Sequence, residues 1–169
     1  MLKLREYNAC DAEVITKWIG NEYAFRQWSA DRYKKYPITA NDMNYYYDTE
    51  KNNNQMYIMT AYDESDIVGH FTLRFVGEDK ETIRLGFVII DDKKRKKGYG
   101  KQMVDLAVRY GFETIGVNKI SLGVFENNSD AIKCYRSCGF EQIKTEIVER
   151  YECMGEIWNC IEMENRKEV

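Results

Sequence analysis

The spacing of apolar residues divides the chain into strand-like and helix-like segments. Residues 2–7 alternate apolar and polar positions, which is typical of a half-buried strand. Two longer apolar runs flank the turn-forming residues 63–66 and predict a hairpin. Including these, strand patterns cover residues 2–7, 56–62, 67–76, 81–90, 119–125, 140–150 and 156–164.

Helical periodicity separates these strands. Apolar residues three and four positions apart predict helices over residues 11–19, 39–51, 101–115 and 128–137. Thr39 fits the N-cap of the second helix, and Gly139 fits a glycine that ends the fourth. Residues 22–38 are rich in aromatic side chains, and we expect them to be irregular. The order β-α-α-β-β-β-α-β-α-β-β predicts one mixed α/β (α+β) domain over residues 1–169, with a central sheet flanked by about four helices.

A basic turn joins the strand that ends at Ile90 to the next helix. It contains Arg95-x-x-Gly98-x-Gly100 within a lysine-rich stretch. A helix start offers unpaired backbone N–H groups and the positive end of the helix dipole, and glycine lets the backbone approach an anion. The turn lacks the Walker A spacing, and Met103 stands where a dinucleotide fingerprint needs its third glycine. The pattern predicts a pyrophosphate site; without further motifs, a solvated basic turn is an equally good interpretation.

A second segment carries Asn128-x-x-Ala131, then Tyr135, then Gly139-Phe140. Together the two segments resemble the signatures of the GNAT acetyltransferases, in the order and at the separation that this family shows. The close resemblance covers about residues 81–145. The C-terminal turn and strand, residues 155–158, are similar to those of the ribosomal-protein N-terminal acetyltransferase branch.

This resemblance implies both a fold and a donor substrate. The fold is a mostly antiparallel sheet of six to seven strands, in which the fourth and fifth strands splay apart, and the donor is acetyl-CoA. The strand backbone before the basic turn would pair with the pantetheine amides, and the turn would hold the pyrophosphate. The cofactor-binding residues implied in this way are Val88, Ile89, Ile90, Arg95, Lys96, Lys97, Gly98, Tyr99, Gly100, Lys101, Asn128, Ala131 and Tyr135.

The resemblance also implies an N-acetyltransferase that moves an acetyl group directly from acetyl-CoA to a primary amine. Tyr135 lies two helical turns after Asn128 on the same helix face, and is the candidate general acid for the leaving thiolate. A core aromatic residue is the alternative interpretation of Tyr135. The backbone N–H of Ile90 is the candidate donor to the oxyanion.

The general base is less well defined by the sequence. Several N-terminal acetyltransferases of this type carry a Glu five residues before the Asn, where this chain has Gly123. His70 and Glu81 are the remaining candidates. An α-amino group, with a pKa of about 7.7–8.0, needs a weaker base than a lysine, with a pKa of about 10.4. We therefore expect the acceptor to be a peptide N-terminus or a small-molecule amine.

The acceptor site is expected within residues 21–57, where aromatic side chains are crowded. They predict a pocket or a peptide groove, and the alternative is that half of them pack helices onto the sheet. These residues are Tyr23, Phe25, Trp28, Tyr33, Tyr36, Tyr45, Tyr46, Tyr47 and Tyr57. Two other functions stay open: a non-catalytic acyl-CoA-binding regulatory module of the same fold, and a nucleotide-binding protein.

Composition narrows the partners. The 169 residues carry a net charge of -3, which argues against nucleic acid as a partner. The longest apolar runs fall well short of a membrane span, and the N-terminus does not resemble a signal peptide. The odd count of five cysteines suggests reduced thiols and a cytoplasmic location, and a single histidine makes a metal centre unexpected. Exposed C-terminal strands would favour pairing in a homodimer.

Overall fold

The computed structural model describes the backbone of residues 1–169 and the side chains of all of them except residues 53 and 54. The strands are β1 (Lys3–Glu6), β2 (Met56–Asp63), β3 (Asp66–Val76), β4 (Thr82–Ile90), β5 (Lys119–Phe125), β6 (Glu141–Gln142), β7 (Arg150–Cys153) and β8 (Glu156–Arg166). The α-helices are α1 (Ala12–Ile15), α2 (Glu22–Ser29), α3 (Ala40–Asn54), α4 (Tyr99–Arg109) and α5 (Ser129–Ser137). Short 3-10 turns cover Ala9–Asp11, Thr16–Trp18 and Asp92–Lys94, and a π-helical segment, Tyr110–Ile115, extends α4.

The predicted mixed α/β fold is confirmed. The strands follow the order β1-β2-β3-β4-β5-β8-β6, and β7 pairs with β8 off this path. All of these pairings are antiparallel except that of β4 with β5, which is parallel. The resulting sheet has eight strands rather than the six to seven expected, because the C-terminal region forms three strands instead of two.

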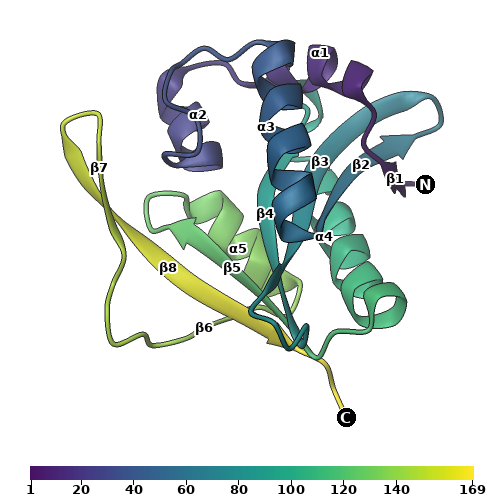
Figure 1. Ribbon diagram of the computed structural model, residues 1–169, viewed down its shortest axis with the longest axis vertical. Helices are drawn as coiled ribbons and strands as arrows, with labels where there is room; N and C mark the ends of the chain where they lie inside the picture. The colour runs from purple at the N-terminus through teal and green to yellow at the C-terminus, as the bar shows by residue number, and fades with distance from the viewer.

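The predicted splay lies between β4 and β5. Their pairing covers only three positions and ends at Arg84 opposite Ser121, so that the remaining residues of both strands are unpaired with one another. Figure 1 shows the two strands starting together and diverging, with α2 beyond the open end. Divergence leaves backbone N–H and C=O groups on the facing edges of both strands without a neighbouring strand.

A β-bulge in β4 adds a local distortion that the sequence did not predict. His70 is opposite Ile89 and Thr72 is opposite Gly86, so two residues of β4 lie against the single residue Phe71. Within this bulge, Phe87 has a φ of 50°. A bulky residue with positive φ is strained, and such strain tends to occur at functional sites.

Two hydrophobic clusters cover the two faces of the sheet. The larger cluster packs α4 and α5 against one face and includes Ile90, Val124 and Tyr135. The smaller cluster packs α1 and α3 against the other face and includes Trp18, Tyr47 and Ile89. Adjacent residues of β4 therefore belong to opposite faces, as strand geometry requires.

One prediction for the first half of the chain was wrong. Residues 22–38 are not wholly irregular, because α2 occupies Glu22–Ser29. Asn21 caps this helix by accepting a hydrogen bond from the Ala24 N–H at 2.8 Å, and Arg26 lies 3.9 Å from Glu22 one turn away. An Asn N-cap and an i,i+4 ion pair are both legible in a sequence, so the signal for this helix was present.

The C-terminal hairpin of β7 and β8 projects from the body of the protein beside α2 (Figure 1). Residues 140–150 were expected to form a strand, but only the two residues of β6 pair within that segment before Arg150. Met154 and Ile157 of the hairpin are 53% and 70% exposed. Dimerisation through this hairpin stays a prediction.

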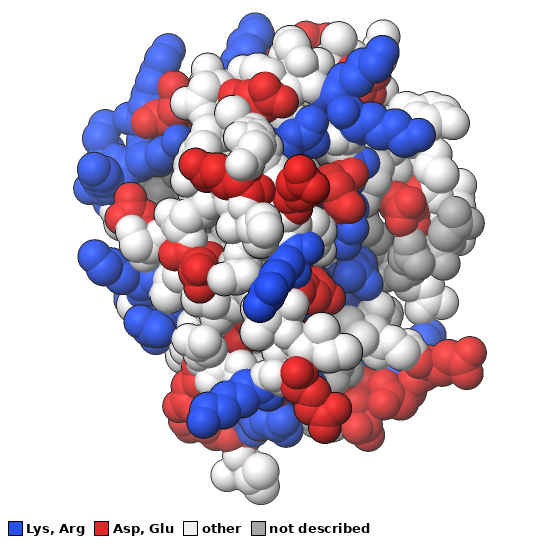
Figure 2. Space-filling view, turned by 90° about the vertical axis from the view of Figure 1, so that its left-hand side faces the viewer, with Lys and Arg blue, Asp and Glu red and all other residues white. Residues whose placement is uncertain are grey.

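The surface of the side that carries the hairpin has mixed charge. Figure 2 shows acidic and basic side chains interspersed over this side, without one broad basic area. Among the described residues, no helix is long and apolar enough to cross a membrane. Within that same set, no group of three or more His, Cys, Asp or Glu side chains is arranged to hold a metal ion. All five cysteines are free thiols.

Candidate active site

The basic turn leads directly into the start of α4. Gly98 is the N-cap of this helix with a φ of 84°, and the first helical bond runs from the Gln102 N–H to the Gly98 carbonyl at 3.1 Å. The helix thus begins two residues earlier than predicted, so the backbone N–H groups of Tyr99, Gly100 and Lys101 lie in its first turn without helical partners. This is the arrangement that binds phosphate oxygens.

The lysines around this helix start differ in their partners. Lys94 lies 3.3 Å from Asp66, and Lys101 lies 2.7 Å from Asp105. Lys96 and Lys97 are exposed and form no ion pair with any residue that the structure describes. Their ammonium groups are therefore available to an anion at the start of α4.

Arg95 and Tyr99 anchor the turn to the rest of the protein. Arg95 donates from Nε to the Ile90 carbonyl at 3.2 Å and from Nη2 to the Trp18 carbonyl at 3.4 Å. The Tyr99 hydroxyl donates to Asp63 Oδ2 at 3.2 Å. The basic turn is thereby fixed to the end of β4, to the N-terminal segment and to β2. Both residues were predicted to bind the cofactor, and their side chains position the turn that would do so.

Helix α5 brings the second predicted motif to the same place. Asn128 caps this helix, with its side-chain oxygen 3.4 Å from the Ala131 N–H. Gly100 has no Cβ, but a Cβ built there would lie 3.7 Å from Cys134 Sγ of α5. The start of α4 and helix α5 are therefore in close contact. The two motifs, 28 residues or more apart in sequence, therefore border one opening in the sheet.

Tyr135 lies on the buried side of α5. It is 8% exposed and packs edge-on against Phe140, with the ring centroids 5.9 Å apart. Burial raises the pKa of the Tyr135 hydroxyl, which keeps the group protonated at neutral pH. Its hydroxyl forms no hydrogen bond to another residue in the described part of the chain. Tyr135 shares a hydrophobic cluster with Ile90, and Val88 and Ala131 pack against this cluster.

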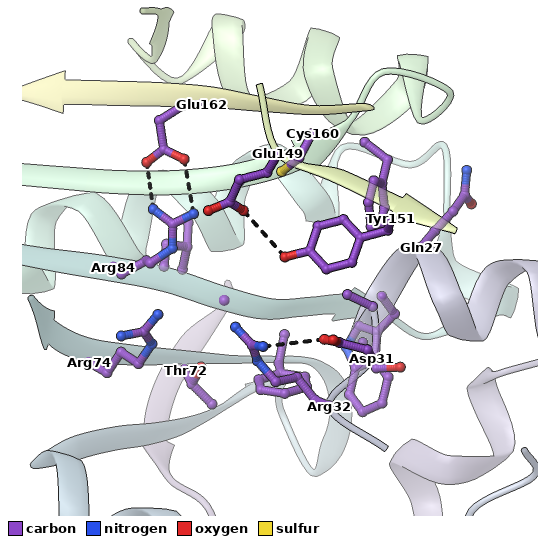
Figure 3. A pocket seen from close by; sticks show the side chains of 18 of the residues that line it. Gln27, Asp31, Arg32, Thr72, Arg74, Arg84, Glu149, Tyr151, Cys160 and Glu162 are labelled. Carbon is purple, nitrogen blue, oxygen red and sulfur yellow. Dashed lines mark hydrogen bonds and ion pairs between the residues drawn. The ribbon is translucent and has the colours of Figure 1, made fainter. Parts of the chain in front are cut away.

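A large cavity lies on the opposite face of the sheet. It has a volume of about 1160 Å³, and both β4 and β5 contribute to it beyond their last paired residues, through Gly86, Phe87, Gly123 and Phe125. Its other walls come from α2 and the segment after it, from α3, β2 and β3, from the segment before β7, and from β7 and β8. Figure 3 shows charged side chains from these elements converging on it, namely Asp31, Arg32, Arg74, Arg84, Glu149 and Glu162.

Gly123 has a structural explanation in this cavity. Arg84 reaches across β5 to Glu162, with contacts of 2.5 and 3.0 Å, and also donates to Ser121 Oγ at 3.2 Å (Figure 3). A Cβ at Gly123 would lie 2.8 Å from Arg84 Nη2. A side chain at position 123, where some relatives carry a carboxylate, would collide with this ion pair, whereas Gly123 leaves room for it. Glu162, the cross-strand partner of Gly123, supplies the nearby carboxylate instead.

The two candidate bases lie away from the cavity. His70 is fully buried beneath α3, with Nε2 2.6 Å from the Tyr47 hydroxyl, and it does not line the cavity. Glu81 is exposed and precedes β4 at the end where β4 and β5 are paired, nine residues before Ile90. Nine residues of strand span about 30 Å. Glu81 is therefore far from the predicted oxyanion donor. His70 lies opposite Ile89, next to that donor in the sheet, but its side chain is buried against Tyr47.

The burial of His70 predicts a pH-dependent stability. Burial lowers the pKa of His70 to about 4, whereas an unfolded histidine titrates at about 6.5. Between these values the unfolded chain binds the proton and the folded chain does not, so the free energy of unfolding falls as the pH drops from about 6.5 to about 4. This group alone accounts for about 3 kcal/mol over that range.

Urea unfolding of wild type and His70→Gln between pH 7.5 and 4.5 measures this contribution. The glutamine does not titrate and keeps a polar group beside the Tyr47 hydroxyl. We expect wild type to lose more stability than the variant on acidification, since all other titrating groups are shared. Parallel stability profiles for the two proteins would contradict the assignment.

Some aromatic residues of the N-terminal third pack helices onto the sheet, and others line the cavity. Phe25, Tyr33 and Tyr47 are buried, and Trp28, Tyr46 and Tyr47 all have ring contacts with Phe87 of the bulge. Trp28 and Tyr46 also line the cavity. Tyr45, in contrast, is 76% exposed. Part of the set therefore packs the core and part forms the wall nearest the bulge.

Several residues of this cavity were not anticipated from the sequence. Thr72 and Arg74 alternate with apolar residues along β3, whereas Glu149 precedes β7 and Tyr151 lies in β7. Polar residues at every second position of an otherwise apolar strand indicate that one face is not covered by core. That signal was available for β3, whereas nothing local marks Glu149.

Comparisons with known proteins agree with this geometry. The family model described as Acetyltransferase (GNAT) family matches residues 22–140. A spermine/spermidine N(1)-acetyltransferase of Bacillus subtilis (strain 168) is 33% identical over 85 residues, which are 47% of this chain and 56% of that protein. Acetyltransferase PseH of Campylobacter jejuni is 25% identical over 143 residues, which are 83% of this chain and 85% of that protein.

Solved structures share the fold. The crystal structure of spermidine N-acetyltransferase from Vibrio cholerae in complex with CoA and spermine has a TM-score of 0.81, with 20% identity over 98% of this chain and 95% of that chain. The sequence match to the Bacillus relative spans about half of that protein's length. The family model, in contrast, matches most of this chain and includes both motifs. The chain therefore belongs to the Acetyltransferase (GNAT) family.

Proposed function

We propose that this chain is an enzyme that transfers an acetyl group from acetyl-CoA to the primary amine of a small molecule. The observation that carries the proposal is the splay of β4 from β5, which is bordered by the start of α4, by Tyr135 and by the cavity. A donor that enters along one side of the splay and an acceptor that occupies the cavity would meet between the two strands.

The donor site is supported by three features of the chain. Lys96 and Lys97 are free of ion pairs within the described residues, and the first turn of α4 presents unpaired N–H groups for the pyrophosphate. Residues 88–90 leave a strand edge open on the side of β5, to which the pantetheine amides would hydrogen bond. Acetyl-CoA supplies the acetyl group as a thioester, which an amine can attack directly.

Two groups would stabilise the charge that develops during transfer. The Asp91 N–H donates to the Val68 carbonyl of β3, so that the alternation of an antiparallel ladder turns the Ile90 N–H away from β3, toward the splay. We assign this N–H to the developing oxyanion. Tyr135 would donate its proton to the departing sulfur, because its raised pKa keeps the proton available until the thiolate forms.

The acceptor must lose a proton, and we propose that a group lining the cavity accepts it. His70 and Glu81 both lie outside it, so we retain neither. Glu149 lines the cavity, accepts a hydrogen bond from the Tyr151 hydroxyl at 3.3 Å and forms no ion pair with any described residue (Figure 3). We propose that this carboxylate attracts the ammonium form of the acceptor and accepts its proton through solvent.

The acceptor class is proposed from the relatives and the cavity together. The names of the Bacillus relative and of the Vibrio structure refer to spermine and spermidine, which are small-molecule amines. The cavity has a volume of about 1160 Å³, slightly above the roughly 300–1,000 Å³ of typical small-molecule sites, so it has room for a small amine. We therefore favour a small molecule over the peptide N-terminus that the ribosomal-protein branch would imply.

Calorimetry and turnover together test this function. Titration with acetyl-CoA and, separately, with ATP is expected to show binding of acetyl-CoA alone. A panel of primary amines, including polyamines and a peptide with a free N-terminus, is then assayed by CoA thiol release. Release that depends on a small-molecule amine supports the proposal. Acetyl-CoA binding without release on the whole panel would instead favour a non-catalytic acyl-CoA-binding module.

A further inference from the structure

Arginine side chains line one wall of the cavity, and one of them has no ion-pair or hydrogen-bond partner among the residues whose side chains the structure describes. Arg74 of β3 lies directly opposite Arg84 of β4 in the register of the sheet, and both line the cavity. Like charges directly opposite on neighbouring strands destabilise a sheet. We expect two arginines to lie opposite one another only where negatively charged groups offset their repulsion.

Intramolecular partners offset the charge of two arginines in this wall. Arg84 is held by both carboxylate oxygens of Glu162, and Arg32 lies 3.4 Å from Asp31. Arg74 forms neither a hydrogen bond nor an ion pair with any residue whose side chain is described. Figure 3 shows its guanidinium on the same side of the cavity as Arg32, with no carboxylate joined to it.

The surroundings of Arg74 leave its charge incompletely compensated. Burial, followed by the neighbouring charges of Arg84 and Arg32, lowers the pKa of Arg74, whereas Tyr46 and Glu50 act in the opposite direction. The first three effects outweigh the last two. A partly buried guanidinium gains most from a ligand with two oxygens in one plane, because its N–H groups form a rigid fork.

The opposite wall carries the complementary charge. Glu149, just before β7, and Tyr151, within β7, face the cavity across from β3 (Figure 3). Arg74 lies two residues from Thr72, which is opposite Gly86 at the edge of the bulge. Two residues of strand span about 7 Å, so a positive subsite lies at about that distance along β3 from the bulge.

From this arrangement we infer that the acceptor carries an anionic group at the end remote from its reacting amine, and that Arg74 binds this group with Arg32 beside it. The anion is a carboxylate or a phosphate, since both match the guanidinium fork. The inference rests on the proposed function and narrows its substrate class. An acceptor with a second ammonium at that end would be repelled by the same arginines.

Amines of matched length test the inference. The probes are 6-aminohexanoate, 1,6-diaminohexane and 3-aminopropyl phosphate, each assayed with acetyl-CoA for CoA release. With wild type, we expect kcat/KM to be at least about tenfold higher for an anionic acceptor than for the diamine, which corresponds to about 1.4 kcal/mol. The better of the two anionic probes distinguishes carboxylate from phosphate. Equal or better use of the diamine would overturn the inference and leave the proposed function in place.

Charge variants of one residue sharpen the comparison. Arg74→Gln should remove the preference for the anion, and Arg74→Glu should reverse it in favour of the diamine. Arg109→Glu is the matched control, because Arg109 is exposed near the end of α4 and does not line the cavity. A preference that persists in Arg74→Glu would refute the assignment to Arg74.

A binding measurement separates this inference from failure of the proposed function. If no amine is acetylated, the proposed function is wrong, and the subsite is judged by calorimetric titrations of the CoA-bound protein with 6-aminohexanoate and with 3-aminopropyl phosphate. Binding to wild type that is lost in Arg74→Gln supports an anion subsite independently of turnover. Absence of binding to wild type would overturn the inference.

Discussion

Replacing Tyr135 by phenylalanine is expected to reduce kcat by about a hundredfold or more while leaving the Kd for acetyl-CoA nearly unchanged. General acid catalysis contributes about 10²–10⁴-fold to a rate, and the variant removes only the proton that would pass to the departing sulfur. The hydroxyl has no hydrogen-bond partner among the described residues, so its loss should cost little stability. Steady-state turnover and calorimetry on the same preparation measure the two quantities.

Tyr110→Phe provides the matched control for this prediction. Tyr110 packs against the same hydrophobic cluster as Tyr135, but it lies in the π-helical segment at the far end of α4. Burial raises the pKa of its hydroxyl as well. We expect this variant to retain wild-type kcat. Unchanged turnover in Tyr135→Phe would remove Tyr135 from the mechanism and leave it the role of a core aromatic residue.

The second large effect is expected for Gly98→Val, which should weaken acetyl-CoA binding by about tenfold or more. Gly98 has a φ of 84°, a conformation in which an L-residue is strained by about 1–2 kcal/mol, and a β-branched residue more. A Cβ at this position meets only Gln102 Nε2, at 3.9 Å, so the space beside it is open on the side of the basic turn. The valine would fill that space and shift the first N–H groups of α4. Calorimetric titration with acetyl-CoA measures the loss.

Gly116→Val separates loss of the site from loss of stability. Gly116 follows the π-helical segment with a φ of 85°, and no atom lies within 4 Å of a Cβ built there. The backbone strain is therefore matched, at a position remote from the start of α4. Both variants should melt at lower temperature than wild type, and only Gly98→Val should lose affinity. Normal acetyl-CoA affinity in Gly98→Val would show that the pyrophosphate lies elsewhere.

Features that depend on residues close together in the sequence were predicted well. The strand over Lys119–Phe125 was predicted with these bounds, and the capping of α3 by Thr39 is present, with Thr39 Oγ1 accepting from the Asp42 N–H at 3.2 Å. Asn128 likewise caps α5. These features depend on residues within one turn or one strand of each other, so the local sequence is sufficient to predict them. Both GNAT motifs are of this kind.

Errors arose where the pattern was interrupted or was ambiguous. The helix α2 was overlooked because its aromatic residues suggested a pocket rather than an apolar face, although Phe25 is fully buried. The strand expected after Phe140 is mostly absent, because only Glu141 and Gln142 find a partner in β8. Pairing of that segment depends on residues 21 and 23 positions away, which no local pattern reports.

The amino-acid sequence by itself determined the family and the mixed sheet, and it led to the proposed place of the donor site, because all three follow from short motifs and apolar periodicity. Tertiary structure alone decided the acceptor side. Four features depend on strand register: the bulge at Phe87, the Arg84–Glu162 pair over Gly123, the position of Arg74 opposite Arg84, and the burial of His70 against Tyr47. Register brings together side chains from β3, β4, β5 and β8, and a shift of one residue would turn each of them to the other face.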